Sequence, residues 1–201
     1  MNSESIPEYK IILASNSSIR QKILEDSGIS FEVVPSEVEE EELKQSLSSN
    51  NFREYCLALA KAKALDVSNK KKNAYVIGSD QICCYGEEIF SKPLTKENCF
   101  KTLSKLSGNT HYQNCGISIC KNGKEIWSHY AQAALTMKSL SDTDIRDYID
   151  KDEPFMACGA YRFESLGKDL FLTTKGDETT IQGLTLNPII NFLTSKKVIN
   201  L

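Results

Sequence analysis

Short apolar segments alternate with longer amphipathic segments along this chain, which is typical of a protein built from strands and helices. An apolar strand is expected at residues 10–14, and a helix at 19–27, whose helical spacing directs Ile23 and Leu24 inward and which a glycine follows as a stop. The next strand is expected at residues 31–34. The chain therefore opens with a strand, a hydroxyl-rich turn and a helix.

The rest of the chain continues this alternation and adds a hairpin. An acidic run at residues 37–42 passes into a helix-like stretch, and further helices are expected at residues 51–68, 95–106, 141–151 and 188 to about 196. Strands are expected at residues 74–77, 113–121, 125–138 and about 170–173. Asn122-Gly123 is a strong hairpin signal between two of them. Because a hairpin is antiparallel, we predict an α/β protein with a mixed sheet.

Composition limits the function classes. The chain has 201 residues, 24 basic and 27 acidic, and a net charge of -3, so no electrostatic feature predicts a nucleic-acid partner. No apolar stretch approaches the roughly 20 residues of a membrane span, and the start of the chain lacks the basic and apolar regions of a signal peptide. We expect a cytoplasmic protein without a membrane partner. No repeat or linker divides the chain, which predicts a single domain over residues 1–201.

The cysteines and histidines give little sign of a metal site. The seven cysteines form no Cys-x-x-Cys pair, and most lie among apolar neighbours, so we interpret them as reduced core residues. His111 with Cys115 is the nearest approach to ligand spacing, and it is a weak one. A hydrolase using Cys83 or Cys84 as nucleophile is an alternative, but neither has a histidine nearby in the sequence.

Residues 77–93 present an acid and a base from one short unit. The apolar run of the strand stops at Ile77, and we expect the strand to end where Asp80 follows. A hairpin is expected through Tyr85-Gly86-Glu87, after which Lys92 precedes a proline on a stiffened turn. Since α/β proteins place their chemistry at strand ends, Asp80 and Lys92 are candidate catalytic residues. A strand with an ordinary polar loop is the alternative.

A hydroxyl-rich turn near the start of the chain suits a phosphate. Ser15 and Ser17 lie where a helix opens, and free backbone N–H groups and the helix dipole favour an anion there. Arg20 would add a bidentate partner. The alternative is that these serines only cap the helix.

Further charged residues could complete such a site. Glu40 and Asp80 could hold Mg²⁺, which takes one or two carboxylates together with phosphate oxygens and waters. Lys63, on the third expected helix, would supply another positive charge. Taken singly, Glu40 could belong to a solvated acidic face and Lys63 to the surface of an amphipathic helix.

Six segments, in order along the chain, resemble the motifs of one family. They are similar to L-A-S-x-S-P-R-R-x-x-L-L, V-D-E, L-A-x-x-K-A, I-G-[AS]-D, x-K-P and L-S-G-x-x-H, and here they are Leu13 to Leu24, Val38 to Glu40, Leu59 to Ala64, Ile77 to Asp80, Ser91 to Pro93 and Leu106 to His111. Together they resemble the Maf family of nucleoside triphosphate pyrophosphatases over nearly the whole chain.

Three features look like the branch of this family that hydrolyses 7-methyl-GTP. Residues 78–83, 92–98 and 157–167 resemble its G-S-D-Q-V-C, K-P-L-T-x-E-N and A-G-S-F-K-x-E-G-L-G, the last with one extra residue before the glycine. Branches acting on dTTP and UTP usually carry Thr at the position of Gln81 and Gln at that of Glu164, so these two residues favour a purine. Ile19 stands where the branch has an aromatic residue that could stack on a cationic base.

The resemblance implies cleavage between the α and β phosphates of a nucleoside triphosphate, with Mg²⁺ or Mn²⁺ as cofactor. It implies catalytic roles for four residues, substrate binding by five and metal binding by two: Asp80, Lys92, Lys63 and Arg20; Ser15, Ser17, Ile19, Gln81 and Glu164; and Glu40 with Asp80. The implied fold is an elongated, twisted mixed sheet with flanking helices and two lobes around a central cleft, commonly a homodimer. A dTTP or UTP pyrophosphatase, and a non-catalytic nucleotide-binding regulator of septum formation, are the alternatives.

Overall fold

The computed structural model describes residues 10–40, 42–43 and 51–200. Its described strands form one sheet in the order β2-β1-β3-β5-β6-β7, with β4 paired to β3 outside this path. β1 is parallel to β2 and β3, and the other pairs are antiparallel, so the expected mixed α/β sheet is confirmed. The strands are β1 (Lys10–Leu13), β2 (Glu32–Val33), β3 (Ala74–Tyr85), β4 (Glu88–Phe90), β5 (Thr110–Lys121), β6 (Lys124–Met137) and β7 (Phe171–Lys175).

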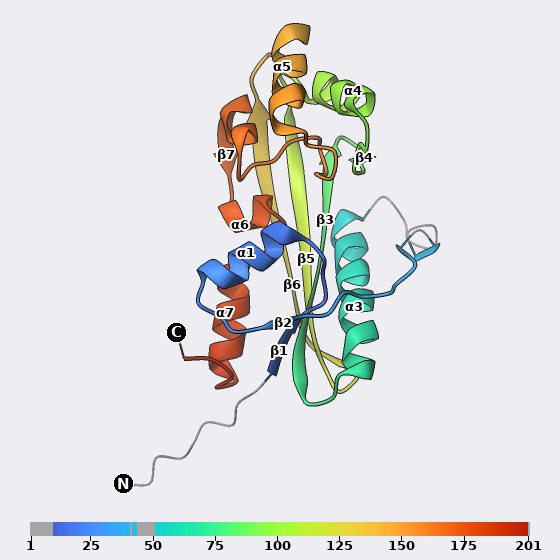
Figure 1. Ribbon diagram of the computed structural model, residues 1–201, viewed down its shortest axis with the longest axis vertical. Coiled ribbons are helices and arrows are strands. Elements are labelled where there is room, and N and C mark those ends of the chain that lie inside the picture. The colour runs from blue at the N-terminus through green and yellow to red at the C-terminus, as the bar shows by residue number, and fades with distance from the viewer. Residues whose placement is uncertain (1–9, 41, 44–50, 201) are drawn as a thin grey trace.

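Helices cover both faces of this sheet (Figure 1). They are α1 (Ser18–Asp26), α3 (Phe52–Lys70), α4 (Lys96–Leu106), α5 (Asp142–Asp152), the 3-10 helix η1 (Leu166–Leu170), α6 (Glu178–Ile181) and α7 (Leu186–Ser195). A helix-like stretch is also expected after the acidic run at residues 37–42. It falls largely on residues 44–50, which lie outside the described residues. The sequence pattern does not predict α6 and η1, because they are too short to produce a periodic pattern. No helix within the described ranges is long and apolar enough to cross a lipid bilayer.

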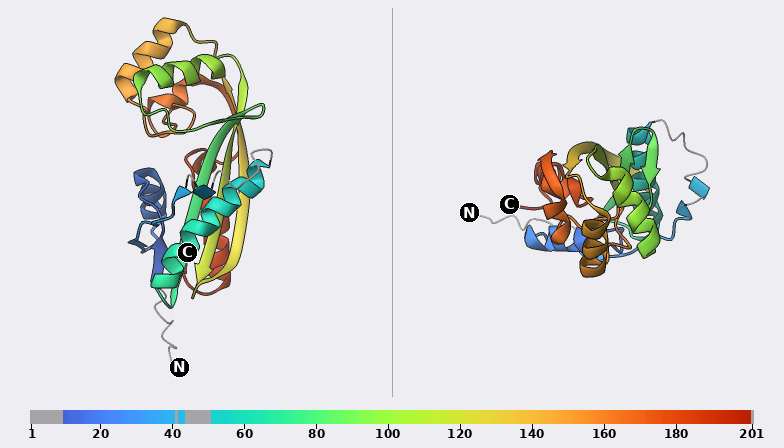
Figure 2. Two further views of the ribbon diagram at one scale, coloured as in Figure 1. Left: turned by 90° about the vertical axis from the view of Figure 1, so that its right-hand side faces the viewer. Right: turned by 90° about the horizontal axis from the view of Figure 1, so that it is seen from above.

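Two hydrophobic cores lie toward the two ends of the long strands β3, β5 and β6, as the views of Figures 1 and 2 show. One core packs α4 and α5 against β6 and the segment around Tyr161. The other packs α1 and α7 against one face of β1, β3 and β5, while α3 covers the opposite face. The expected elongated molecule with two lobes is therefore confirmed.

β3 connects the two lobes and carries Asp80 in its middle. The prediction that this strand ends before Asp80 is wrong, because β3 runs from Ala74 to Tyr85 and Asp80 pairs with Gly116 of β5. The apolar pattern is interrupted by Ser79 and Gln81 because these residues lie between the two cores, which include Ile77 on one side and Cys83 on the other. The polar residues in the sequence of β3 therefore mark the boundary between the two cores. The backbone hydrogen bonds between β3 and β5 continue across this boundary.

The described cysteines occupy core positions. All seven are free thiols and six are buried, so their interpretation as reduced core residues is confirmed. Burial raises the pKa of the Cys83 thiol well above its ordinary value. A buried, protonated thiol is a poor nucleophile, which argues against the cysteine-hydrolase alternative.

Glycines allow α3 to lie close against β3 and β5. A Cβ atom at Gly78 would lie 2.2 Å from the carbonyl oxygen of Ala60, and one at Gly116 would lie 2.5 Å from the carbonyl carbon of Cys56. α3 presents a buried stripe that includes these two helix residues and Lys63. The close approach of the helix backbone therefore brings Lys63 to the level of Asp80.

Gly78→Ala is expected to lower the free energy of unfolding by about 3 kcal/mol, because its methyl group would overlap a helix backbone that cannot move without disturbing the core. Urea denaturation of both proteins measures the change. Gly28→Ala is the control: nothing lies within 4 Å of the added methyl and only the strain of a φ of +77° remains, at a cost of about 1 kcal/mol. If both changes lowered the free energy of unfolding equally, the close approach of α3 to β3 would not depend on Gly78.

Candidate active site

One edge of β3 lacks a strand partner between the two lobes. β1 pairs with β3 as far as Ile77, and β4 pairs with it only from Cys83 onward. Between these positions, β5 is the only described strand beside β3. The turn that follows β1 contains Ser15 and Ser17, and the segment that follows β4 contains Lys92. The chain therefore leaves the sheet on either side of this gap, through segments that contain candidate residues.

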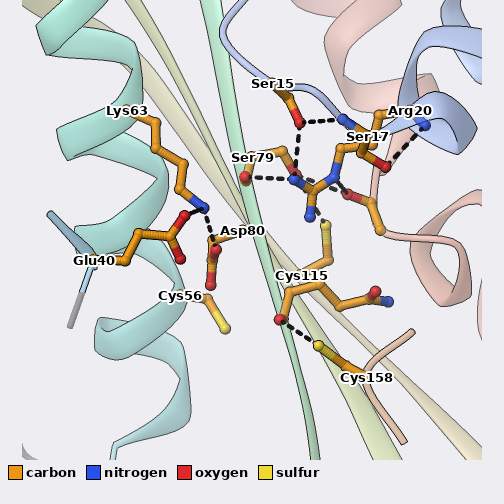
Figure 3. Close-up of polar contacts among 12 residues, drawn as sticks. Ser15, Ser17, Arg20, Glu40, Cys56, Lys63, Ser79, Asp80, Cys115 and Cys158 are labelled. Carbon is orange, nitrogen blue, oxygen red and sulfur yellow. Dashed lines mark hydrogen bonds and ion pairs between the residues drawn. The ribbon is translucent and has the colours of Figure 1, made fainter. Parts of the chain in front are cut away.

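An acid and lysine cluster lies on the α3 side of β3 (Figure 3). Lys63 Nζ lies 2.7 Å from Asp80 Oδ1 and 2.9 Å from Glu40 Oε1. Asp80 and Lys63 are each 7% exposed. The neighbouring Cys56 thiol has its pKa raised, first by burial and then by the negative charge of Asp80. Two carboxylates thus meet one cation at the rim of the strand gap.

A serine and arginine cluster lies on the other face of β3 (Figure 3). Ser17 caps α1 by accepting a hydrogen bond from the Arg20 backbone N–H, and its own N–H donates to Ser15 Oγ at 3.2 Å. Arg20 donates from Nη1 to the Ser79 carbonyl at 2.9 Å and from Nε to the Gly183 carbonyl at 2.8 Å. Within the described part of the chain no hydrogen bond uses Nη2, so this nitrogen can meet an anion.

The two clusters are separated by the pleat of one strand. Ser79 and Asp80 are consecutive, and side chains of consecutive strand residues point to opposite faces. The serine turn therefore stands on one side of the open edge of β3 and the carboxylates on the other. An extended phosphate chain lying along this edge could contact both clusters at once.

The residues expected to contact the base lie in two places. Ile19 and Glu164 line the same cavity of about 290 Å³ between α1 and the other lobe, together with Lys22, Ile23, Asp26, Phe163, Ser165, Lys168, Glu178 and Gln182. Gln81 does not line it: its amide nitrogen donates to the carbonyls of Thr180 and Ile181 at 3.1 and 2.7 Å. These bonds occupy the amide donors of Gln81, so only its Oε1 atom is left for a ligand.

Lys92 is exposed in the segment between β4 and α4. No ion pair of Lys92 is found within residues 10–40, 42–43 and 51–200, whereas Lys63 is buried in its pair of carboxylates. An exposed lysine without an ion pair among the described residues is suited to bind an anionic ligand. The two lysines therefore differ: Lys63 is held in an ion-paired cluster, and Lys92 is open to solvent.

The carboxylates are the only predicted metal ligands that converge. No group of three or more His, Cys, Asp and Glu side chains suited to a metal exists among the described residues. His111, proposed with Cys115 as a weak site, instead contacts the Tyr161 hydroxyl at 2.9 Å, and burial lowers its pKa to about 4. Glu40 and Asp80, meeting at Lys63, fit the oxygen ligands that Mg²⁺ takes when substrate phosphates and waters complete its shell.

The sequence did not reveal the importance of the segment around α6. Its carbonyls at Thr180, Ile181 and Gly183 hold the side chains of Gln81 and Arg20. Gly183 has a φ of +99°, which glycine adopts without strain. Two local signals could have indicated this segment: Asp177, which caps α6 by accepting the N–H groups of Thr179 and Thr180, and a glycine followed by an apolar residue.

The fold is that of an α/β protein with a mixed sheet, and acidic and basic side chains lie on the two faces of β3 at the gap in its edge. A sequence model described as "Maf-like protein" matches residues 10–196, and the chain therefore belongs to the Maf family.

Named proteins resemble nearly the whole chain. A nucleoside triphosphate pyrophosphatase of Legionella pneumophila (strain Corby) is 40% identical over 199 residues, covering 99% of this chain and 100% of the relative. A 7-methyl-GTP pyrophosphatase of Brucella abortus biovar 1 (strain 9-941) is 37% identical over 195 residues, covering 95% and 98%. Among solved structures, the Staphylococcus aureus Ham1 protein has a TM-score of 0.49 at 16% identity, covering 93% of this chain and 99% of that one.

Proposed function

We propose that this protein hydrolyses the bond between the α and β phosphates of a purine nucleoside triphosphate resembling 7-methyl-GTP, releasing the monophosphate and pyrophosphate. The broader class is that of its relatives: the protein is a nucleoside triphosphate pyrophosphatase, a hydrolase. The observation that carries the finer proposal is the open edge of β3, with basic and acidic side chains at its rim and a cavity lined by Ile19 and Glu164 nearby.

Basic groups from both lobes would hold the triphosphate. Lys92 and Nη2 of Arg20 would neutralise charge on the phosphates, and this stabilisation would grow as charge develops in the transition state. The N-terminus of α1, capped by Ser17, adds backbone N–H groups directed toward an anion. The fixed hydrogen bonds of Arg20 to the Ser79 and Gly183 carbonyls mean that little reorganisation is needed when the substrate binds.

The carboxylate side of the gap would activate water. Asp80 would accept a proton from a water molecule that attacks the α phosphorus, and Lys63, at 2.7 Å from Asp80 Oδ1, would hold this carboxylate in one orientation. Glu40 and Asp80 would bind the divalent cation, Mg²⁺ or Mn²⁺, which when bound supplies Lewis-acid stabilisation to phosphate oxygens. Lys63, already between both carboxylates, keeps them close together before any ligand arrives.

The cavity between the lobes would select the base. A carboxylate such as Glu164 can accept hydrogen bonds from N1–H and the 2-amino group of guanine, which pyrimidines lack. Ile19 provides an apolar surface on the opposite element of the same cavity. The relative named for 7-methyl-GTP supports this assignment.

A nucleotide panel tests the proposed substrate. We expect 7-methyl-GTP or another purine triphosphate to have a higher kcat/KM than dTTP or UTP, measured as pyrophosphate release with excess Mg²⁺. Glu164→Gln should reduce this preference by about 10² or more, because a site built to bind N–H groups then loses an acceptor and gains a competing donor.

The control for that variant is Glu97→Gln, an exposed glutamate on α4 that pairs with Lys101. It should leave the base preference unchanged. A preference of the parent protein for pyrimidines would replace the purine proposal with a dTTP or UTP pyrophosphatase. Nucleotide binding with no turnover of any substrate would instead favour the non-catalytic regulator.

A further inference from the structure

Asp152 is a buried carboxylate that neither the acid and lysine cluster nor the serine and arginine cluster uses. It ends α5 and its side chain is 3% exposed. Its Oδ1 atom accepts a hydrogen bond from Ser165 Oγ at 2.6 Å, and its Oδ2 atom accepts one from the Tyr148 hydroxyl at 2.8 Å. A buried carboxylate is costly unless its oxygens are hydrogen-bonded, and here both are. Asp152 is therefore fixed in one geometry.

The partners of Asp152 lie in the loop that carries Glu164. The Tyr148 hydroxyl, while donating to Asp152, accepts a hydrogen bond from the Arg162 backbone N–H at 2.9 Å. Burial raises the pKa of this hydroxyl, so it remains a donor. Arg162 also donates from Nη1 to the Asp152 backbone carbonyl at 3.3 Å. The end of α5 thus holds the loop at Arg162 and at Ser165, on both sides of Glu164.

Contacts within the loop complete this arrangement. The Arg162 carbonyl accepts hydrogen bonds from the backbone N–H groups of Ser165 and Gly167 at 3.1 and 3.0 Å. A Cβ atom on Gly167 would lie 2.5 Å from that carbonyl oxygen, so the turn requires glycine. The Arg162 guanidinium approaches Glu164 Oε1 at 3.4 Å from its Nε atom. Phe163 is packed in the core and also lines the cavity beside Glu164, so burial of Phe163 anchors the loop next to the residue that it presents.

We propose that Asp152 is a positioning residue for base selection, acting through Ser165, Tyr148 and Arg162 to hold Glu164 in the cavity. This inference rests on the proposed function insofar as the cavity receives the base. Discrimination between bases requires a hydrogen-bond acceptor at a fixed distance from the edge of the base, and a mobile loop cannot maintain that distance. Catalytic groups at the β3 gap lie on other elements and do not depend on this loop for their contacts.

Ser165→Ala tests the inference by removing one tether and retaining the carboxylate, its Tyr148 bond and the chain's charge. We expect KM for the preferred nucleotide to rise about tenfold and kcat to change less than about twofold, since the interaction lost serves binding of the base. The ratio of kcat/KM between the preferred base and the least preferred base should fall by a similar factor. Tyr148→Phe, which removes the second tether, should reduce the same ratio.

The matched control is Ser195→Ala, which removes a hydroxyl bonded to the Phe192 carbonyl at the end of α7 and should leave the ratio unchanged. A lowered melting temperature with an unchanged ratio for both tether variants would overturn the inference and make Asp152 purely structural. A parent protein without base discrimination would also overturn it. A parent protein that prefers pyrimidines would contradict the proposed substrate alone, and a flattened preference in Ser165→Ala would then still support the positioning role.

Discussion

Asp80→Asn is expected to reduce kcat by about 10³ or more while the protein stays folded, because a carboxylate that accepts a proton and binds a cation becomes a neutral amide. The change is nearly isosteric at a site that is 7% exposed. Lys63 keeps Glu40 as a charged partner, so no buried ammonium is left without one. We therefore expect Asp80→Asn to lose activity without losing stability.

Pyrophosphate release with excess Mg²⁺ or Mn²⁺ measures this effect, and thermal unfolding measures the integrity of the fold. Asp150→Asn is the matched control, since Asp150 is an exposed aspartate of α5 paired with Lys96. The control should retain full activity. Turnover of the Asp80 variant within a few-fold of the parent would exclude its catalytic role.

Lys92→Ala is expected to lower kcat/KM by about 10², because the lysine would meet negative charge that grows on the phosphates in the transition state. Its side chain is exposed and has no ion pair among the described residues, so unfolding should be almost unaffected. A fall in kcat as well as in kcat/KM would show that the interaction strengthens in the transition state.

Lys101→Ala provides the matched control, because Lys101 is an exposed lysine on α4 whose partner, Glu97, lies on the same helix. Its kinetics should match the parent. If Lys92→Ala lost only thermal stability, Lys92 would have to be assigned a structural contact. Arg20 is less suited to this test, because its guanidinium holds two backbone carbonyls and its removal would disturb the fold as well as the site.

Much of the local structure could be predicted because it depends on neighbours along the chain. The Asn122-Gly123 turn joins β5 to β6 as expected, since both residues adopt the positive φ that such hairpin turns need. Ser17 caps α1 and Thr95 caps α4, because a hydroxyl there can accept a backbone N–H of the first helical turn. The motifs and their order along the chain also indicate the Maf family without any tertiary contact.

Other features depend on residues far apart in the sequence and could not be predicted. The ladder to β5 carries β3 through Asp80, although the apolar pattern stops before it. The amide of Gln81 is bound by carbonyls about a hundred residues away, and the carboxyl group of Asp152 holds a loop that the sequence shows only as a motif.

The sequence by itself determined which residue types this protein brings to its chemistry and which segments form helices and turns, because propensity and capping act within a few residues. Only the tertiary structure decided which face of β3 each group occupies and which groups are already bound. The physical reason is that a buried charge or amide needs a hydrogen-bond or ion-pair partner. The packing of the two lobes around β3 determines which residues lie close enough to be that partner.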